Sequence, residues 1–380
     1  MSLTYGFHAR EAHPLDRIIE KAHHAPKRPP ERGDPTGQAS EPDVMPGAKT
    51  SPVHLVGRSV AALLLLAATL TMGCGPQEDP SKLNNTSGVN PRADMGVAQD
   101  MGADMSAPTT LTVASFNVRF LFDTTCDSGR CGSGQFEQLP SGGELEARIE
   151  QLQEAIRTLD ADVIIFQEIE TPEVFDQLTA PFASEYPTRE FGETGFSASL
   201  DVGMISRWEL AEVRRHKADT TLTTREGART SFARELLEVH VKRGGHRAIV
   251  FGAHFTSKSS DTTGARREAE ADKAAELAVT RLGEFPDALV IVGGDLNDTP
   301  DSAPLQRMVM RGMTNTADGQ PADTYFSYIY QGRRQVIDHL LFVPHDGVGY
   351  DRDAMRAFHE SGDGFAGSDH SAVRARFELR

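Results

Sequence analysis

Polar side chains stand at or near the ends of several apolar segments that read as buried strands. In the stretch VIVGGDLND at 290–298, an apolar run leads through Gly293 and Gly294 into carboxylate and amide side chains. Side chains of this kind at strand ends are Asn117, Glu168, His254, Asp295, Asn297, Asp338, Asp369 and His370. Each alone is more often a cap or turn residue than a catalyst. Because strand ends converge where ligands commonly bind, the joint pattern predicts one shared cleft.

The residue types in this set indicate metal-assisted hydrolysis. Carboxylates, imidazoles and amides crowded into one cleft are costly without a counter-charge. A hard divalent cation supplies that charge, and Mg²⁺, which prefers oxygen ligands, is the expected ion, with Mn²⁺ or Ca²⁺ as alternatives. The same positive charge suits attack on an anionic phosphodiester, because it offsets charge that develops at phosphorus. Gly293 and Gly294 are expected to let the backbone turn sharply and approach a substrate closely.

The elements that must position these residues follow from the apolar periodicity. The predicted strands are 110–122, 162–169, 201–208, 234–242, 247–255, 287–297, 335–343 and 371–379. The predicted long helices are 144–161 and 266–285. Because the strands do not all look parallel and alternate with helices, they predict an α/β sandwich of two packed sheets with helices outside.

Several motifs in this order resemble the endonuclease/exonuclease/phosphatase superfamily, which is related to DNase I and exonuclease III. The motifs are SFNVRFL, VIIFQEIE, GAHFTSKS, VGGDLNDTP, IDHLLF and GSDHSAV. The resemblance covers residues 110–380, and the combination of QE, GDLN and SDH is what makes it specific. It implies a DNase I-like α/β fold: a four-layer sandwich of two packed mixed β-sheets flanked by helices.

The resemblance also implies which residues bind the metal and the attacking water. Glu168 of QE would be the main metal ligand, with Asn117 of FNV and Asp369 of SDH nearby. Asp295 and Asn297 of GDLN would orient the water and bind the scissile phosphate.

The remaining roles fall to the histidines and their partner. His370 of SDH would contact a phosphate oxygen or act as general base, and His254 of AHF would be the second histidine at the phosphate. Asp338 of IDH would orient a histidine. Ala253 departs mildly from the usual Asn or Thr before the family's histidine.

Other polar residues have weaker assignments. Arg234 and Lys258 are candidate phosphate contacts, and solvated surface charges are an equally good reading of them. Asp201 is not securely aligned with the family's additional carboxylate. His339 and His240 are interpreted as structural or packed histidines rather than ligands.

The N-terminal part of the chain predicts export. Residues 59–70 form an apolar run too short for a membrane span but typical of a signal peptide, and LTMGC at 70–74 resembles a bacterial lipobox. A plain secretory signal or a short anchor is the alternative. We expect an upstream disordered extension at 1–44, a lipoprotein signal peptide at 45–73, a disordered tether at 74–109 and a phosphoesterase domain at 110–380.

The cysteines support the same prediction. Cys74 would carry the lipid that anchors the protein to the bacterial envelope, unless the protein is released to the outside. Cys126 and Cys131 would then close a small disulfide loop, as exported proteins allow.

The chain is acidic, with a formal net charge of −16, and so repels nucleic acid at long range. A cation-loaded cleft can reverse that sign locally, and export favours a surface nuclease that acts transiently on DNA or RNA as a monomer. The alternative is a phosphatase or phosphodiesterase acting on an inositol phosphate, sphingomyelin or a similar small or lipid phosphoester. A binding module with an inactive site is disfavoured because every residue of the core set is present.

Overall fold

The computed structural model describes residues 109–132, 134–321, 323–360 and 364–380. The chain divides into two units, Met1–Met101 and Gly102–Arg380, and the described residues belong to the second. The predicted extension, signal peptide and lipidated Cys74, and the tether as far as residue 108, lie outside the described residues. Within the described ranges, no helix is long and apolar enough to cross a membrane.

The first sheet has six strands in the order β15-β16-β1-β2-β4-β3. Their bounds are β1 Thr109–Leu121, β2 Val163–Ile169, β3 Thr188–Gly192, β4 Asp201–Ser206, β15 Val348–Phe358 and β16 Ala372–Leu379. β1 and β2 are parallel, whereas β16 pairs antiparallel with β1 and β4 pairs antiparallel with β2. The sheet is therefore mixed, with the parallel pair at its centre.

The second sheet repeats this arrangement with six strands in the order β11-β14-β10-β9-β8-β5. Their bounds are β5 Glu209–Arg215, β8 Leu237–Arg243, β9 His246–His254, β10 Leu289–Asp295, β11 Thr314–Asn315 and β14 Asp338–Phe342. β9 and β10 form the parallel central pair. The small hairpins are β6 Leu222–Thr223 with β7 Arg229–Thr230, and β12 Tyr328–Tyr330 with β13 Arg333–Gln335.

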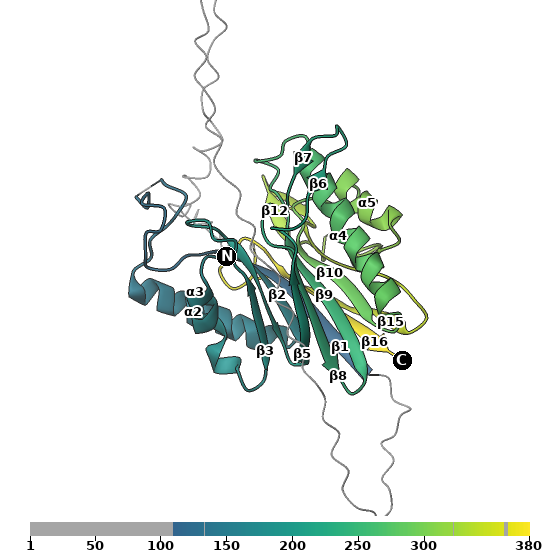
Figure 1. Ribbon diagram of the computed structural model, residues 1–380. Coiled ribbons are helices and arrows are strands. Elements are labelled where there is room, and N and C mark those ends of the chain that lie inside the picture. Colours follow the sequence, from purple (N-terminus) through teal and green to yellow (C-terminus); the bar gives the residue numbers. More distant parts are fainter. Residues whose placement is uncertain (1–108, 133, 322, 361–363) are drawn as a thin grey trace, which may run out of the picture. The chain divides into compact units, whose positions relative to one another are not determined.

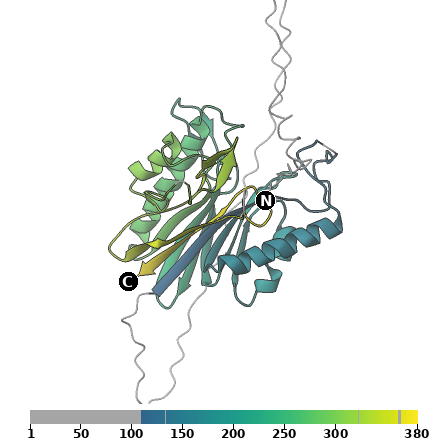
Figure 2. The same ribbon diagram turned by 180° about the vertical axis from the view of Figure 1, so that it is seen from behind.

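Helices cover the outer face of each sheet, which gives four layers (Figure 1). Helices α2 Gly142–Leu159 and α3 Pro172–Thr179, followed by the 3₁₀ turn η1 Ala180–Phe182, cover the first sheet; α4 Ala265–Glu284 and α5 Ala303–Met310 cover the second. The layer between the sheets is one apolar cluster that joins residues such as Val113 and Ile165 to Val250 and Ile291. The predicted four-layer α/β sandwich is confirmed, and the reverse view shows the two helical layers on opposite sides of the sheets (Figure 2).

Helix α2 shows how local sequence fixes an element. Ser141 caps its first turn, and Glu144 reaches back to the Ser141 backbone N–H, so the helix begins with a capping box. The apolar side chains recur at helical spacing and face the sheet: Leu145, Ile149, Leu152, Ile156 and Leu159. The helix ends at Asp160, which takes a left-handed conformation.

Gly293 and Gly294 are required by packing rather than by a substrate. A Cβ at Gly294 would lie 1.8 Å from the carbonyl oxygen of Ala253 in neighbouring β9, and Gly294 has φ +148°. A Cβ at Gly293 would lie 2.8 Å from Cδ1 of Ile165, which belongs to the opposite sheet. The glycines are therefore explained by packing and not by a substrate. The two sheets and their neighbouring strands lie too close together here for any side chain.

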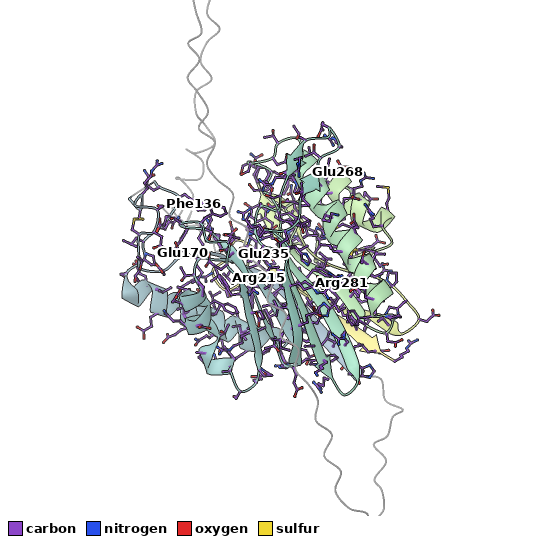
Figure 3. The ribbon with its side chains drawn as sticks, in the orientation of Figure 1. Phe136, Glu170, Arg215, Glu235, Glu268 and Arg281 are labelled. Atoms are coloured by element: carbon purple, nitrogen blue, oxygen red, sulfur yellow. A yellow bond between two sulfur atoms is a disulfide. The ribbon has the colours of Figure 1, made fainter. Side chains whose placement is uncertain are left out.

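A buried ion network accounts for His240. The carboxylate of Glu238, fully buried on β8, lies 2.6 Å from His240 Nε2, 2.6 Å from His216 Nε2 and 2.6 Å from Arg281 Nε. Arg281 reaches this carboxylate from α4 (Figure 3). The Glu238–Arg281 pair joins α4 to the second sheet, and His240 lies beside it among structural partners, in agreement with its interpretation as a packed histidine.

Candidate active site

The central parallel strands of both sheets end at the same end of the sandwich. Asn117 and Glu168 lie near the carboxyl ends of β1 and β2, and His254 and Asp295 end β9 and β10. Asp295 is in register with His254 on one side and with Asp338 of β14 on the other. Chain topology therefore brings together residues that are far apart in the sequence.

The Asn117 side chain joins the two sheets. Its Nδ2 donates to Glu168 Oε1 at 3.0 Å and to Asp295 Oδ2 at 3.1 Å. Its Oδ1 accepts from the backbone N–H of Arg119 at 2.9 Å, which fixes the orientation of the amide. In this arrangement the amide nitrogen, and not the oxygen that could bind a metal, faces the carboxylates.

The backbone around Asn117 and Glu168 is strained. Arg119, Phe120 and Glu168 have φ of +55°, +48° and +68°, a backbone region that residues other than glycine rarely adopt. This conformation lets the Phe120 N–H donate to Glu168 Oε2 at 3.0 Å. Such outliers cost about 1–3 kcal/mol each and cluster at functional sites. No sequence pattern predicts these conformations, because none of these residues is a glycine.

Asp295 is a buried carboxylate among other carboxylates. Burial, followed by the charges of Asp338 and Glu168, raises its pKa to about 7, although the charge of His370 acts in the opposite direction. The backbone N–H of Asn297 donates to Asp295 Oδ1 at 2.9 Å, and the Asn297 side chain donates to the Phe255 carbonyl at 3.1 Å. Asn297 thus holds the turn in which Asp295 is presented.

His370 is paired with Asp338. Its Nδ1 lies 2.8 Å from Asp338 Oδ2, and its Nε2 lies 3.9 Å from Asp295 Oδ2. Burial alone would lower the pKa of His370, but the charges of Asp338 and Asp295 and the hydrogen bond to Asp338 raise it well above its usual value. His370 is therefore an imidazolium with Nε2 directed toward the cleft side of Asp295.

His254 has the opposite protonation state. Burial, followed by the nearby charges of Arg234 and His370, lowers its pKa well below the usual value. Its Nε2 lies 3.6 Å from Asp295 Oδ2 and 4.0 Å from Glu168 Oε1, while its buried Nδ1 has no hydrogen-bond partner among the described residues. The site therefore holds one charged and one neutral histidine.

The donor atoms at this site fit a hard divalent cation. Within the described ranges, one oxygen or nitrogen each from Glu168, His254 and Asp295 lies within 4.8 Å of the others, and so does one each from Asp295, Asp338 and His370. The carboxylates of Glu168 and Asp295 share the single amide group of Asn117, which leaves their mutual repulsion only partly offset. A cation between Glu168 and Asp295 would remove that repulsion.

Asp369 lies at the edge of this arrangement. Its Oδ2 is 3.5 Å from Arg119 Nε, and its side chain remains one-third exposed. It belongs to neither group of converging donor atoms found in the described part of the chain. The structure thus brings Glu168, Asp295, Asp338, His254 and His370 together, and places Asp369 beside them in an ion pair.

The residues with weaker assignments lie outside the donor groups. Lys258 Nζ contacts Asp298 Oδ1 at 3.1 Å, and Asp201 accepts hydrogen bonds from Thr194 and Ser199. His339 is fully buried and its Nε2 lies 2.9 Å from the Asp298 carbonyl, which is a structural contact. Arg234 is near enough to His254 to lower the pKa of that histidine, so it stays a candidate phosphate contact.

The sequence analysis assigned no role to three residues that support His370, although Ser368 belongs to the SDH motif. The Tyr328 ring lies 4.9 Å from the His370 ring. Burial, followed by the charge of Asp369, raises the pKa of the Tyr328 hydroxyl to about 12. Ser327 Oγ accepts from the backbone N–H groups of Ile337 and Asp338, both at 2.9 Å. Ser368 Oγ donates to the Asn117 carbonyl at 2.7 Å, which ties the SDH turn to β1.

Comparison with known proteins agrees with this geometry. The model of the Endonuclease/Exonuclease/phosphatase family matches residues 114–370. No curated protein matches the sequence. Among solved structures, an endonuclease/exonuclease/phosphatase from Bacteroides vulgatus is 17% identical, covers 72% of this chain and 100% of its own, and has a TM-score of 0.50.

Two further solved structures are similar. TDP2 from C. elegans is 17% identical, with 74% of this chain and 78% of that chain covered and a TM-score of 0.50. D. rerio TDP2 complexed with a single strand DNA product is 18% identical, with 71% and 99% covered and a TM-score of 0.50. At these identities the likeness is one of fold.

Proposed function

Because the chain belongs to the endonuclease/exonuclease/phosphatase family, we propose that it is a Mg²⁺-dependent phosphodiesterase that cleaves DNA or RNA. The observation that carries the proposal is the convergence of Glu168, Asp295 and the Asp338–His370 pair at the shared end of both sheets. That D. rerio TDP2 holds a single strand DNA product supports nucleic acid as the substrate class.

The residues of the site have two kinds of role in hydrolysis: stabilisation of charge and transfer of a proton. Glu168 and Asp295 would hold the cation, which supplies Lewis-acid polarisation of the phosphate when bound. The Asp295 carboxylate is placed to take the proton from the attacking water, in a turn held by Asn297. The His370 imidazolium, kept charged by Asp338, is placed to donate to a phosphate oxygen on which charge develops.

His254 contributes from the other side of Asp295. Because it is neutral and its Nε2 lies 3.6 Å from Asp295 Oδ2, it can donate a hydrogen bond to a phosphate oxygen without adding a buried charge. Arg234 adds positive charge on that side. With the cation bound, His370 and Arg234 would offset the carboxylate charge of the site where an anionic substrate approaches.

The second candidate is a phosphodiesterase acting on a lipid or small phosphoester such as sphingomyelin or an inositol phosphate. An exposed apolar side chain close to the site favours it: Phe136 packs against Phe120 beside Glu168 and is 59% exposed, and Phe196 elsewhere in the chain is 66% exposed. Because Phe136 and Phe196 are far apart along the chain, the sequence alone does not predict an apolar surface formed by both. A substrate panel that includes sphingomyelin, inositol phosphates, DNA and RNA separates the two candidates.

We predict that the purified protein cleaves nucleic acid with Mg²⁺, loses activity in EDTA and regains it when Mg²⁺ is restored. Glu168→Gln should raise the Mg²⁺ concentration for half-maximal activity about 10–100-fold, because a charged ligand becomes neutral. Glu173→Gln, at an exposed position at the start of α3, should leave this concentration unchanged. Cleavage of sphingomyelin or inositol phosphates without cleavage of DNA or RNA would establish the second candidate instead.

We also propose that the protein is exported and anchored through a lipid on Cys74, on the strength of the lipobox-like LTMGC at 70–74. Fractionated cells should show the protein in the membrane fraction carrying acyl label. Cys74→Ser should remove both the label and the membrane association. A wild-type protein that is soluble and unlabelled would refute the anchor and leave the proposed chemistry untouched.

A further inference from the structure

A cluster of aromatic rings lies directly beside the site. The Phe136 ring contacts Phe120 and Phe122 at centroid distances of 5.8 Å and 5.8 Å, with interplanar angles of 79° and 90°. Phe120 and Phe122 lie 6.0 Å apart and close to parallel. We call Phe120, Phe122 and Phe136 the phenylalanine cluster. Phe136 nevertheless remains 59% exposed, so a large aromatic surface is held in place but left uncovered.

The phenylalanine cluster is continuous with the residues assigned to catalysis. The Phe120 backbone N–H donates to Glu168 Oε2, so the cluster begins at the candidate metal ligand. Arg119, the preceding residue, has its guanidinium 5.9 Å from the Phe120 ring centroid and pairs with Asp369. A group stacked on Phe136 would therefore be part of the same substrate whose phosphate is bound near Asp295.

The loop that carries Phe136 is fixed at several points. Cys126 and Cys131 form the predicted disulfide. The buried Glu137 carboxylate accepts from the backbone N–H groups of Asp127 at 2.7 Å and Ser128 at 2.8 Å. The Glu170 carboxylate accepts from the Asp123 N–H at 2.7 Å, and Figure 3 labels Glu170 and Phe136 on this side of the molecule. A surface fixed before binding loses little entropy when it binds.

A second loop adds an aromatic ring and a positive charge. Ala198 and Leu200 pack against Phe122, and Asp201 holds their loop by accepting from the Thr194 N–H at 3.1 Å. In the same loop, Phe196 is 66% exposed, and Lys217 Nζ lies 5.5 Å from its ring centroid. Lys217 Nζ also donates to the carbonyls of Phe232 and Ala233, so Arg119, at the Phe120 ring, is the cation best placed to meet a phosphate beside a base stacked on Phe136.

We infer that Phe136 is a stacking platform for an unpaired base of a nucleic-acid strand whose scissile phosphate lies at Asp295. The inference rests on the proposed nuclease function and narrows its substrate to single-stranded nucleic acid. Aromatic rings bind bases by stacking regardless of sequence, and nearby cations contact the backbone phosphates.

A lipid surface is the less favoured occupant of this platform. The Phe136 ring packs edge-to-face against Phe120 and Phe122, whereas a side chain that inserts into a membrane projects from its loop into the bilayer. An exposed aromatic ring that packs against Phe120, which itself has Arg119 at its face, matches a base followed by a phosphate better than it matches acyl chains.

An abasic scan combined with substitutions at Phe136 tests the inference. In a short single-stranded oligonucleotide, removal of one base at a time should lower wild-type kcat/KM about 10-fold at a single position relative to the cut. Phe136→Ala should lower kcat/KM on the intact oligonucleotide by a similar factor and abolish the further loss at that position. Phe136→Trp should restore both the rate and the position dependence, whereas Phe136→Leu should behave like Phe136→Ala.

Controls separate this inference from the proposed function. Met310→Ala, which removes an exposed apolar side chain from α5, should change neither rate nor position dependence. Cleavage of nucleic acid with no position-specific abasic effect, or with an effect that persists in Phe136→Ala, would overturn the platform and leave the nuclease in place. Sedimentation with phosphatidylcholine–sphingomyelin vesicles that is lost in Phe136→Ala would assign the surface to lipid. Failure to cleave any nucleic acid would overturn the proposed function itself.

Discussion

Asp295→Asn is expected to lower kcat about 10²- to 10⁴-fold, the range that a positioned general base contributes. The amide keeps the shape of the carboxylate, and its one oxygen can still accept from the Asn297 N–H. Its NH2 group then faces Asn117 Nδ2, which also donates, so that contact is lost. The amide cannot take a proton from water. Because Asp295 would also hold the cation, the assays need saturating Mg²⁺. Under that condition rapid-mixing single-turnover assays should show a slow chemical step with substrate binding near the wild-type value.

The same substitution should not destabilise the fold. Asp295 is buried beside Asp338 and Glu168, and these neighbours together with burial raise the pKa of its carboxyl to about 7. A neutral side chain relieves that repulsion, so the Tm without metal should stay level or rise. Asp301→Asn, at an exposed position in the following turn, serves as the control and should retain wild-type kcat. A variant with wild-type kcat and a raised KM would show that Asp295 binds substrate and does not act on the water.

The sequence carried enough information to predict the sandwich but not its edges. Buried central strands such as 162–169 and 287–297 have continuous apolar runs, which periodicity detects, and both are present as β2 and β10. β5 and β15 were missed. β5 has only partly buried and exposed residues, and β15 has a register shift between Asp351 and Arg356. Edge strands lack the alternation that a buried face imposes.

The candidate site was predictable where it depends on residue type and chain order, and unpredictable where it depends on tertiary contacts. Glu168, Asp295 and His370 follow from polar residues at strand ends. The left-handed backbone at Phe120 and Glu168 has no such signal, because neighbouring elements impose it. The phenylalanine cluster was missed for a related reason: Phe136 meets Phe120 and Phe122 only through the folded loop.

Asp338→Asn is expected to lower kcat about 10³-fold at neutral pH, again within the range for groups that control proton transfer. Asp338 Oδ2 is the partner of His370 Nδ1, and its charge helps to raise the pKa of His370 well above the usual value. Without that charge, burial is opposed only by the charges of Asp295 and Asp369, so the pKa of His370 falls and less of the imidazole is protonated at the pH of the assay. The phosphate then loses a cationic donor, and the ring loses the partner that fixes its orientation.

The pH dependence of the loss of kcat in Asp338→Asn shows whether Asp338 keeps His370 charged or only orients its ring. The protonated His370 of the variant persists only below its lowered pKa, so the ratio of variant to wild-type kcat should be highest at low pH and fall as pH rises. Asp298→Asn is the matched control, since Asp298 is also buried and paired, at 2.9 Å with Arg267 Nε, but lies outside the donor groups. It should lower the Tm and leave the kcat of the folded protein unchanged. A ratio for Asp338→Asn that stays constant with pH would mean that Asp338 only orients the ring, and the charge on His370 would then have no part in the chemical step.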